Sequence, residues 1–143
     1  MERRSPRLLS GADCRIVLSF GANDTSIEHG RVRVKADRSL GALATILQEA
    51  ARIGLPTLVL GPAPVDDPKQ NRRINSLSLS FAEVCAEHGV PFVNVIEPLL
   101  ASPVWMEQVA AGDGAHPGAE GYDALADLVL ASGWLDWLRT ETR

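Results

Sequence analysis

Apolar and polar positions divide the chain into strand-like runs and helix-like stripes. Three short apolar runs stand out, at Arg15–Phe20, Thr57–Leu60 and Phe92–Val95. The first two are nearly continuous, as expected for parallel strands that are covered on both faces. Segments with helical spacing lie between and after them. The sequence therefore predicts the order β-α-β-α-β-α, which is typical of a parallel α/β domain with right-handed crossovers.

Three helices are predicted from apolar residues that recur every three or four positions. The first begins near Asp37, a candidate N-cap, and the third spans about Ala119–Ala131. The residues expected to face the core are Leu40, Leu43, Leu47 and Ala51 in the first helix, Ile74, Leu77, Phe81 and Val84 in the second, and Tyr122, Leu125 and Val129 in the third. Gly54 and Gly89, each followed closely by a proline, predict left-handed ends for the first two helices.

Length and composition narrow the class of protein. The 143 residues suit a single domain over 1–143, of which residues 1–12 are expected to be poorly ordered. Hydrophobic residues make up 45% and charged residues 22%, as in an ordinary soluble globular protein. The net charge of −4 argues against nucleic acid as a partner. No apolar run approaches the roughly 18 residues of a membrane span.

The two cysteines point to neither a disulfide framework nor a zinc site. Cys14 and Cys85 are far apart and have no Cys/His spacing around them. Cys85 falls on the apolar face of the second helix and is predicted to be a small core residue. Unpaired cysteines and the lack of a visible export signal favour a cytoplasmic location.

A loop between two predicted elements carries the clearest candidate chemistry. Asp113 precedes His116 by three residues in a glycine-rich segment, and Pro117 holds His116 in the loop before the last helix. The carboxylate of Asp113 can fold back on the imidazole, fix its tautomer and stabilise the imidazolium. These residues alone are explained equally well without a function. Asp113 would then be a turn residue, and His116 an exposed side chain with no role.

The end of the first predicted strand is the second candidate. Asn23 follows this strand directly, and its amide can donate to a developing oxyanion. Taken alone, Asn23-Asp24 is explained as well by turn chemistry, with Gly21 as the residue that lets the strand end kink.

Together these two motifs resemble those of the SGNH hydrolases, also called GDSL esterases or lipases. GxND, which contains Asn23, matches the family's third conserved block, and DxxHP, which contains His116, matches its fifth. The resemblance runs from about Asp13 to Leu135 and implies a flavodoxin-like three-layer α/β/α sandwich.

The same resemblance implies roles for the motif residues. Asn23 would be an oxyanion-hole donor and His116 the general base and acid, oriented by Asp113, while Gly21 and Asp24 would form the supporting turn. It implies a serine esterase or lipase that acts on small-molecule carboxylic esters, without a metal or an organic cofactor.

The nucleophile of that family has no counterpart in this sequence. In the family, a GDS block supplies the serine and one oxyanion N–H, and a second block supplies a glycine N–H. Ser10 does not follow a strand, Ser19 lies inside one, and Ser26 lies beyond Asn23. We therefore expect an N-terminally truncated or nucleophile-lacking form that lacks the first strands of the sheet. A mis-set start, a degraded gene and a protomer whose sheet is completed by another chain remain alternatives.

Other functions remain open at this stage. A non-catalytic remnant or binding module of the same fold would associate through its unpaired sheet edge, as a homo-oligomer for example. A flavin or nucleotide binder is disfavoured because no GxGxxG or P-loop is present. A metal site of Asp24, Asp113 and His116 is disfavoured because nothing else supplies ligands. His29 and the pair Trp105-Met106 are candidate borders of a substrate pocket, although exposure and core packing explain them as well.

Overall fold

The computed structural model describes residues 13–141, so the predicted irregular segment 1–12 lies outside the described residues. The strands are β1 (Ile16–Ser19), β2 (Ile27–Glu28), β3 (Arg31–Val32), β4 (Thr57–Leu60) and β5 (Phe92–Val93). The helices are the short 3-10 turn η2 (Asn23–Thr25), α1 (Ala36–Arg52), α2 (Pro68–Glu87), α3 (Ile96–Leu100), α4 (Pro103–Ala111), α5 (Ala119–Ala131) and α6 (Trp134–Arg139).

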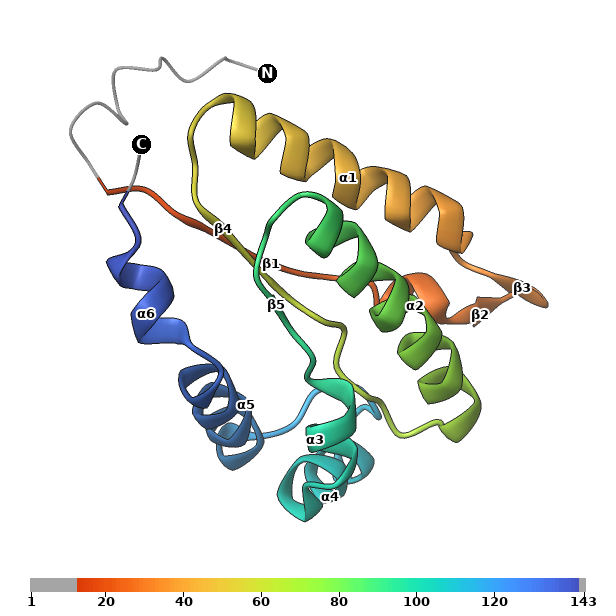
Figure 1. The fold of residues 1–143 in the computed structure, drawn as a ribbon. Helices are drawn as coiled ribbons and strands as arrows, with labels where there is room; N and C mark the ends of the chain where they lie inside the picture. The colour runs from red at the N-terminus through yellow and green to blue at the C-terminus, as the bar shows by residue number, and fades with distance from the viewer. Residues whose placement is uncertain (1–12, 142–143) are drawn as a thin grey trace, which may run out of the picture.

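A parallel three-stranded sheet in the order β1-β4-β5 forms the middle layer. Each new strand is added on the same side of the previous one, so right-handed crossovers place α1 and α2 on one face. Helices α3 to α6 lie on the other face (Figure 1). The predicted α/β architecture with a parallel sheet and helices on both faces is confirmed.

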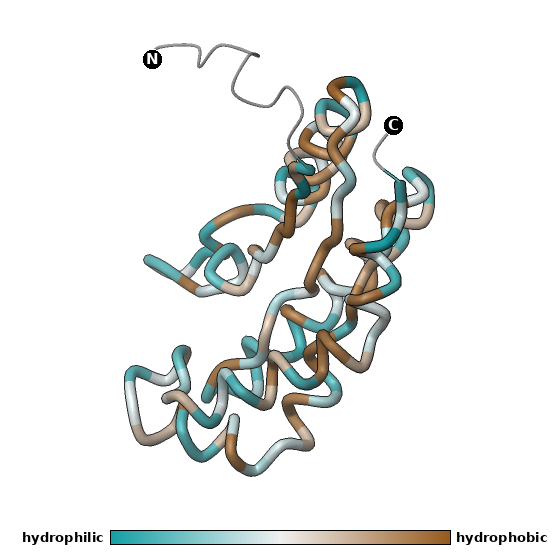
Figure 2. Tube along the Cα trace, turned by 90° about the vertical axis from the view of Figure 1, so that its left-hand side faces the viewer, coloured by the Kyte–Doolittle hydropathy of each residue, from teal (hydrophilic) through white to brown (hydrophobic). Residues whose placement is uncertain are grey.

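The core is divided by the sheet into two apolar clusters. Val59 of β4 packs with residues of α1 and α2, among them Leu43 and Phe81. The adjacent Leu58 faces the opposite side and packs with Trp105 and other residues of the later helices. This alternation follows from the two-residue period of a strand. Figure 2 shows apolar and hydrophilic residues alternating along the helices, as expected for helices with one buried face.

The first two helices end as predicted, but the start of the first differs. Gly54 and Gly89 take left-handed φ values of +72° and +64°. The N-cap of α1 is Lys35, which has an extended backbone, and Asp37 lies inside the first turn instead. Ala51 is exposed and Ala50 is buried in its place, because at 3.6 residues per turn Ala50 lies nearer than Ala51 to the stripe of Leu43 and Leu47.

Two predicted strands are shorter in the structure. The run Arg15–Phe20 forms a strand only over Ile16–Ser19. The run Phe92–Val95 pairs only over its first two residues, because Val95 takes a helical conformation (φ −109°, ψ −19°) and precedes α3. The hairpin β2–β3 and the short helices α3, α4 and α6 have too weak a periodicity to be predicted.

Helix α5 has the predicted bounds but not the predicted buried face. Tyr122 is 47% exposed, whereas Leu125 and Val129 are half-buried. The helix packs mainly against α3, α4 and α6 rather than on a strand. Its apolar residues are therefore covered mainly by other helices rather than by the sheet.

The edge of the sheet at β1 has no neighbouring strand within residues 13–141. Val17 on this strand is 43% exposed, which is high for a valine in a parallel sheet. Arg15 holds the start of the strand to the end of α6 by donating to the carbonyl oxygens of Trp137 and Thr140, at 2.6 and 2.7 Å.

The burial of the cysteines and the length of the helices can also be compared with the predictions. The predicted core position of Cys85 is confirmed, since it is fully buried, while Cys14 is half-buried. No helix of the described range 13–141 is long and apolar enough to cross a membrane.

Candidate active site

Gly21 turns the chain sharply at the end of β1. Its φ of +111° is a conformation that side chains other than glycine rarely adopt. A Cβ on Gly21 would lie 3.1 Å from Leu77 and 3.2 Å from Phe81, both on α2. Glycine therefore lets the strand end approach α2 closely and lead directly into η2.

Asp24 fixes the η2 turn to two other elements. Its carboxylate accepts a hydrogen bond from the hydroxyl of the buried Ser39 on α1, at 2.8 Å. Its carbonyl oxygen accepts one from the N–H of Val34, which follows β3, at 3.0 Å. With the turn held in this way, the exposed side chain of Asn23 makes no hydrogen bond within residues 13–141 and lines a cavity.

Asp113 and His116 form a close pair on the loop before α5. Oδ1 of Asp113 accepts the N–H groups of Ala115 and His116, at 2.9 and 2.8 Å. Oδ2 lies 2.7 Å from Nδ1 of His116. One carboxylate thus makes both the turn and the contact with the imidazole, so the two interpretations left open by the sequence describe the same geometry.

The charge of this pair follows from its hydrogen bonds. The N–H of His116, then its imidazole and the N–H of Ala115, hold the pKa of Asp113 well below its usual range. An ionised carboxylate only accepts hydrogen bonds, so Nδ1 of His116 carries the proton. In the neutral imidazole the lone pair is then on Nε2, which has no hydrogen-bond partner in the described part of the chain.

Several residues that the sequence analysis did not single out support this loop. The carbonyl oxygen of Gly114 accepts the N–H of Asp66, which follows β4, at 2.7 Å. On the other side, Oε1 of Gln108 accepts the N–H of Gly121 at 2.9 Å. Gly121 is buried directly against Pro117. A glycine in the first turn of a helix was the one available signal, since glycine is unfavourable there unless packing requires it.

Asn23 and His116 line the same cavity, which has a volume of about 540 Å³. Its apolar wall includes Trp105 and Tyr122, whose rings meet edge to face with centroids 6.0 Å apart. Trp105 is 2% exposed and its indole N–H donates to the carbonyl oxygen of Pro64, at 3.1 Å. Arg33 from the hairpin lies on the polar side. A cavity of this size, lined by both apolar and polar side chains, suits a small organic ligand.

The serines near this cavity do not contact the imidazole. Ser19, the last residue of β1, is exposed and lines the cavity, but no hydrogen bond joins it to His116. The hydroxyl of Ser26 donates to the carbonyl oxygen of Asn23, at 2.7 Å, and points into the turn. Within residues 13–141, the imidazole therefore has an orienting carboxylate but no hydroxyl as a hydrogen-bond partner.

The other two histidines and Met106 lie away from the cavity. His29 is an exposed residue of the hairpin turn with φ of +51°. His88 ends α2 and bonds through Nδ1 to the carbonyl oxygen of Val84, at 2.9 Å. Met106 packs against the core on α4. No group of three or more His, Cys, Asp or Glu side chains in the described residues is placed to hold a metal ion.

Comparison with known proteins places this geometry in context. The family model of the GDSL-like lipase/acylhydrolase family matches residues 1–124. No curated protein shows significant similarity to the chain.

Solved structures with the same fold include three bacterial hydrolases. A lipase/acylhydrolase from Enterococcus faecalis is 23% identical with a TM-score of 0.68, over 95% of this chain and 67% of that one. A GDSL-like lipase from Bacteroides thetaiotaomicron is 20% identical with a TM-score of 0.68, over 86% and 63%. An acetylxylan esterase from Geobacillus stearothermophilus, in a form with a catalytic aspartate replaced by alanine, is 17% identical with a TM-score of 0.65, over 87% and 61%. The chain thus spans about two thirds of the length of these proteins.

Proposed function

The chain belongs to the GDSL-like lipase/acylhydrolase family, and on that premise we propose that it carries the base and oxyanion half of a serine esterase site. In this proposal His116 is the general base and acid, Asp113 is its positioning residue and Asn23 donates to the oxyanion. The substrate is a small carboxylic ester. Acetyl esters are the first substrates to try, because one structural neighbour is an acetylxylan esterase.

One observation carries the proposal. The imidazole of His116 is held through Nδ1 by an ionised carboxylate at 2.7 Å, its Nε2 makes no hydrogen bond within residues 13–141, and His116 lines a cavity that Asn23 also lines. This is the arrangement that acyl transfer needs, because a base must be oriented and an amide donor must be available for the oxyanion.

The proposed reaction proceeds in two halves. A serine Oγ bonds to the ester carbonyl carbon as Nε2 of His116 takes the hydroxyl proton, and the carbonyl electron pair moves onto the oxygen facing Asn23. Collapse of this intermediate breaks the bond to the alcohol, which leaves with the proton from His116. Water then attacks the acyl-serine with the same base, releasing the acid and restoring the hydroxyl.

We further propose that this serine lies outside residues 13–141, on a segment that covers the free edge of β1. The exposed Val17 and Ser19 lie on this edge, and Ser19 also lines the cavity of Asn23 and His116. A strand added there would end beside that cavity, because parallel strands end at the same side of a sheet. Neighbours with the same fold are longer than this chain, which covers 67% and 63% of their lengths, and this leaves room for such a segment.

Labelling with a fluorophosphonate probe and peptide mapping tests the source of the nucleophile. The 143-residue chain is expected to give no stoichiometric adduct on a serine of residues 13–141. In a longer form or complex that does hydrolyse esters, the adduct should form on another serine and disappear in His116→Ala. In that form Asn23→Ala should cost about 2.7–4 kcal/mol of transition-state stabilisation. A stoichiometric adduct on Ser19 would contradict the proposal.

The same exposed edge favours one alternative, a non-catalytic protein of this fold that associates through β1. Unpaired strand edges with apolar side chains pair readily with other chains. Sedimentation at several concentrations distinguishes the two. A discrete oligomer without esterase activity, converted to monomer by Val17→Lys, would support the alternative.

A further inference from the structure

A groove of about 720 Å³, larger than the candidate active-site cavity, lies on the other side of the hairpin. It is bounded by the hairpin β2–β3, the first turn of α1 and one face of α2. Val32 and Val34 face this groove, whereas Arg33 between them lines the active-site cavity. The alternation of side chains along the hairpin thus separates two cavities. The volume is within the range of about 300–1,000 Å³ found for ligand pockets.

The walls of the groove are mainly apolar. Val32, Val34, Ala36 and Leu77 line it together with the buried Thr25. Val32 is 40% exposed, so part of the apolar wall faces solvent. An alkyl chain on these residues would remove apolar surface from water, at about 25 cal/mol per Å².

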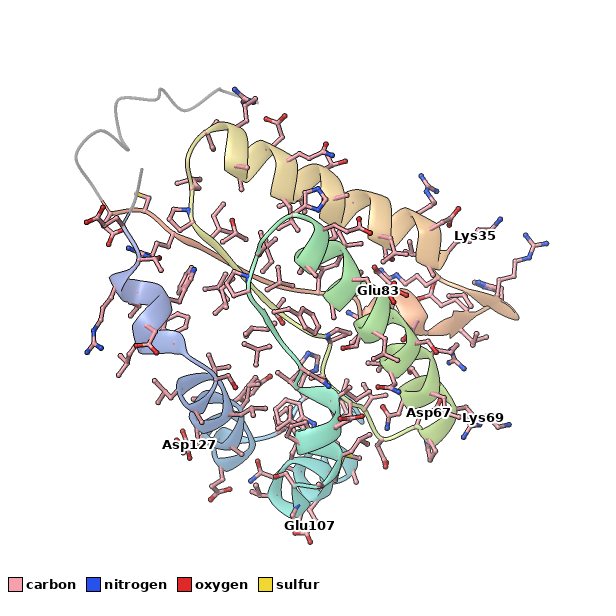
Figure 3. All side chains as sticks on the ribbon, in the orientation of Figure 1. Lys35, Asp67, Lys69, Glu83, Glu107 and Asp127 are labelled. Carbon is pink, nitrogen blue, oxygen red and sulfur yellow. The ribbon has the colours of Figure 1, made fainter. Side chains whose placement is uncertain are left out.

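Basic side chains surround this apolar wall. Lys35 at the start of α1 and Lys69, Arg72 and Arg73 on α2 all line the groove. Figure 3 shows Lys35 and Lys69 on the same side of the molecule, each at the start of its helix. Among the described residues, none of these four cations forms an ion pair with a carboxylate.

The groups nearest to these cations are already engaged. Arg73 donates from Nε to the carbonyl oxygen of Thr25, at 2.8 Å, and from Nη1 to that of Lys69, at 3.2 Å. The carboxylate of Asp67 caps α2 and does not line the groove. Its pKa is lowered by the N–H groups of Gln70 and Lys69, and further by the charges of Arg73 and Lys69. Four cations therefore line one groove in a chain whose net charge is −4.

We propose that this groove binds an amphipathic anion, namely an alkyl chain that carries a carboxylate or phosphate headgroup. The alkyl chain would lie on Val32, Val34 and Leu77. The headgroup would accept charge-assisted hydrogen bonds from Lys35 and Lys69. A bare inorganic anion leaves the apolar wall uncovered, and a neutral alcohol leaves the cations without a counter-charge.

Titration calorimetry at low salt tests this with four soluble probes: octanoate, octyl phosphate, octanol and inorganic phosphate. Octanoate or octyl phosphate should bind at one site per chain, and comparing the two identifies the preferred headgroup. Octanol and inorganic phosphate should each bind at least about tenfold more weakly, because each lacks one half of the interaction. Equal binding of octanol, or of inorganic phosphate, would overturn the proposal, as would no binding of either amphipathic anion.

Charge reversal locates the site. Lys35→Glu and Lys69→Glu should each weaken binding by about tenfold or more, since each replaces a charge-assisted contact by repulsion. Both place an acid at a helix N-terminus, which favours folding. Arg38→Glu is the matched control, because Arg38 is on the first turn of α1 but does not line the groove. Unchanged affinity in both lysine variants would overturn the proposal. The assay measures binding alone, so its result does not depend on the esterase proposal.

Discussion

Replacing Gly121 by alanine directly perturbs the support of the loop that carries Asp113 and His116. A Cβ at this position would lie 2.3 Å from Cβ of Pro117, and 3.0 Å from both Cγ of Pro117 and Oε1 of Gln108. Pro117 follows His116, so α5 rests on the residue that ends the loop.

The expected magnitude follows from two opposing effects. Carbon atoms in contact prefer separations of about 3.5–4.0 Å, so the overlap with the rigid proline ring exceeds about 1 Å. Overpacking of this kind costs about 1–3 kcal/mol, whereas alanine recovers at most about 1 kcal/mol of helix propensity. We expect Gly121→Ala to lower the free energy of unfolding by roughly 1–2 kcal/mol.

Gly41→Ala is the matched control. Gly41 lies inside α1, and a Cβ there would have no atom within 4 Å. This variant should be more stable by about 0.5–1 kcal/mol. Urea unfolding followed by tryptophan fluorescence measures both. The midpoint should fall for Gly121→Ala and rise for Gly41→Ala, and an unchanged or higher midpoint for Gly121→Ala would refute the reasoning.

Three further predictions concern charge, burial and hydrogen bonding. The lowered pKa of Asp113 means that its contribution to stability is complete above about pH 3.9, the unfolded value, and is lost as pH falls through the folded value. Asp113→Asn should therefore lower Tm at pH 6, with a difference from the wild type that shrinks below about pH 4; a constant difference would contradict this. Burial raises the pKa of Cys85 to about 11, so a thiol reagent at pH 8 should modify Cys14 first and Cys85 only on unfolding; equal rates would be inconsistent with the buried thiol. Trp105→Phe removes the donor to the Pro64 carbonyl and should cost about 1–3 kcal/mol in urea unfolding; a loss below about 0.5 kcal/mol would show that this bond contributes little.

The strands and long helices could be predicted because their signals are local. The apolar run at Thr57–Leu60 and the glycines that end α1 and α2 depend only on nearby residues. The buried position predicted for Tyr122 was wrong because α5 packs on other helices, and Tyr122 lies beside Trp105 at the cavity instead. Which surface a helix meets depends on residues far away in the sequence.

In the candidate site, too, contacts between neighbouring residues could be predicted, whereas contacts between distant segments could not. The pairing of Asp113 with His116 is a contact across three residues, and the spacing suggested it. That Asn23 and His116 line one cavity was expected only from the resemblance to a family. The support from Gln108 and Gly121 was missed because it becomes visible only when α4 and α5 are placed side by side.

The most direct test of the central claim is the rate at which the 143-residue chain hydrolyses p-nitrophenyl acetate, compared between His116→Ala and His29→Ala. Both histidines are exposed, but only His116 has a carboxylate partner within residues 13–141 and shares a cavity with Asn23. An imidazole that a carboxylate orients can act on an activated ester without a serine, either as a general base for water or as a nucleophile itself. The account predicts a measurable rate that falls to the buffer level in His116→Ala and is unchanged in His29→Ala. Equal rates in the two variants and the wild type would contradict it.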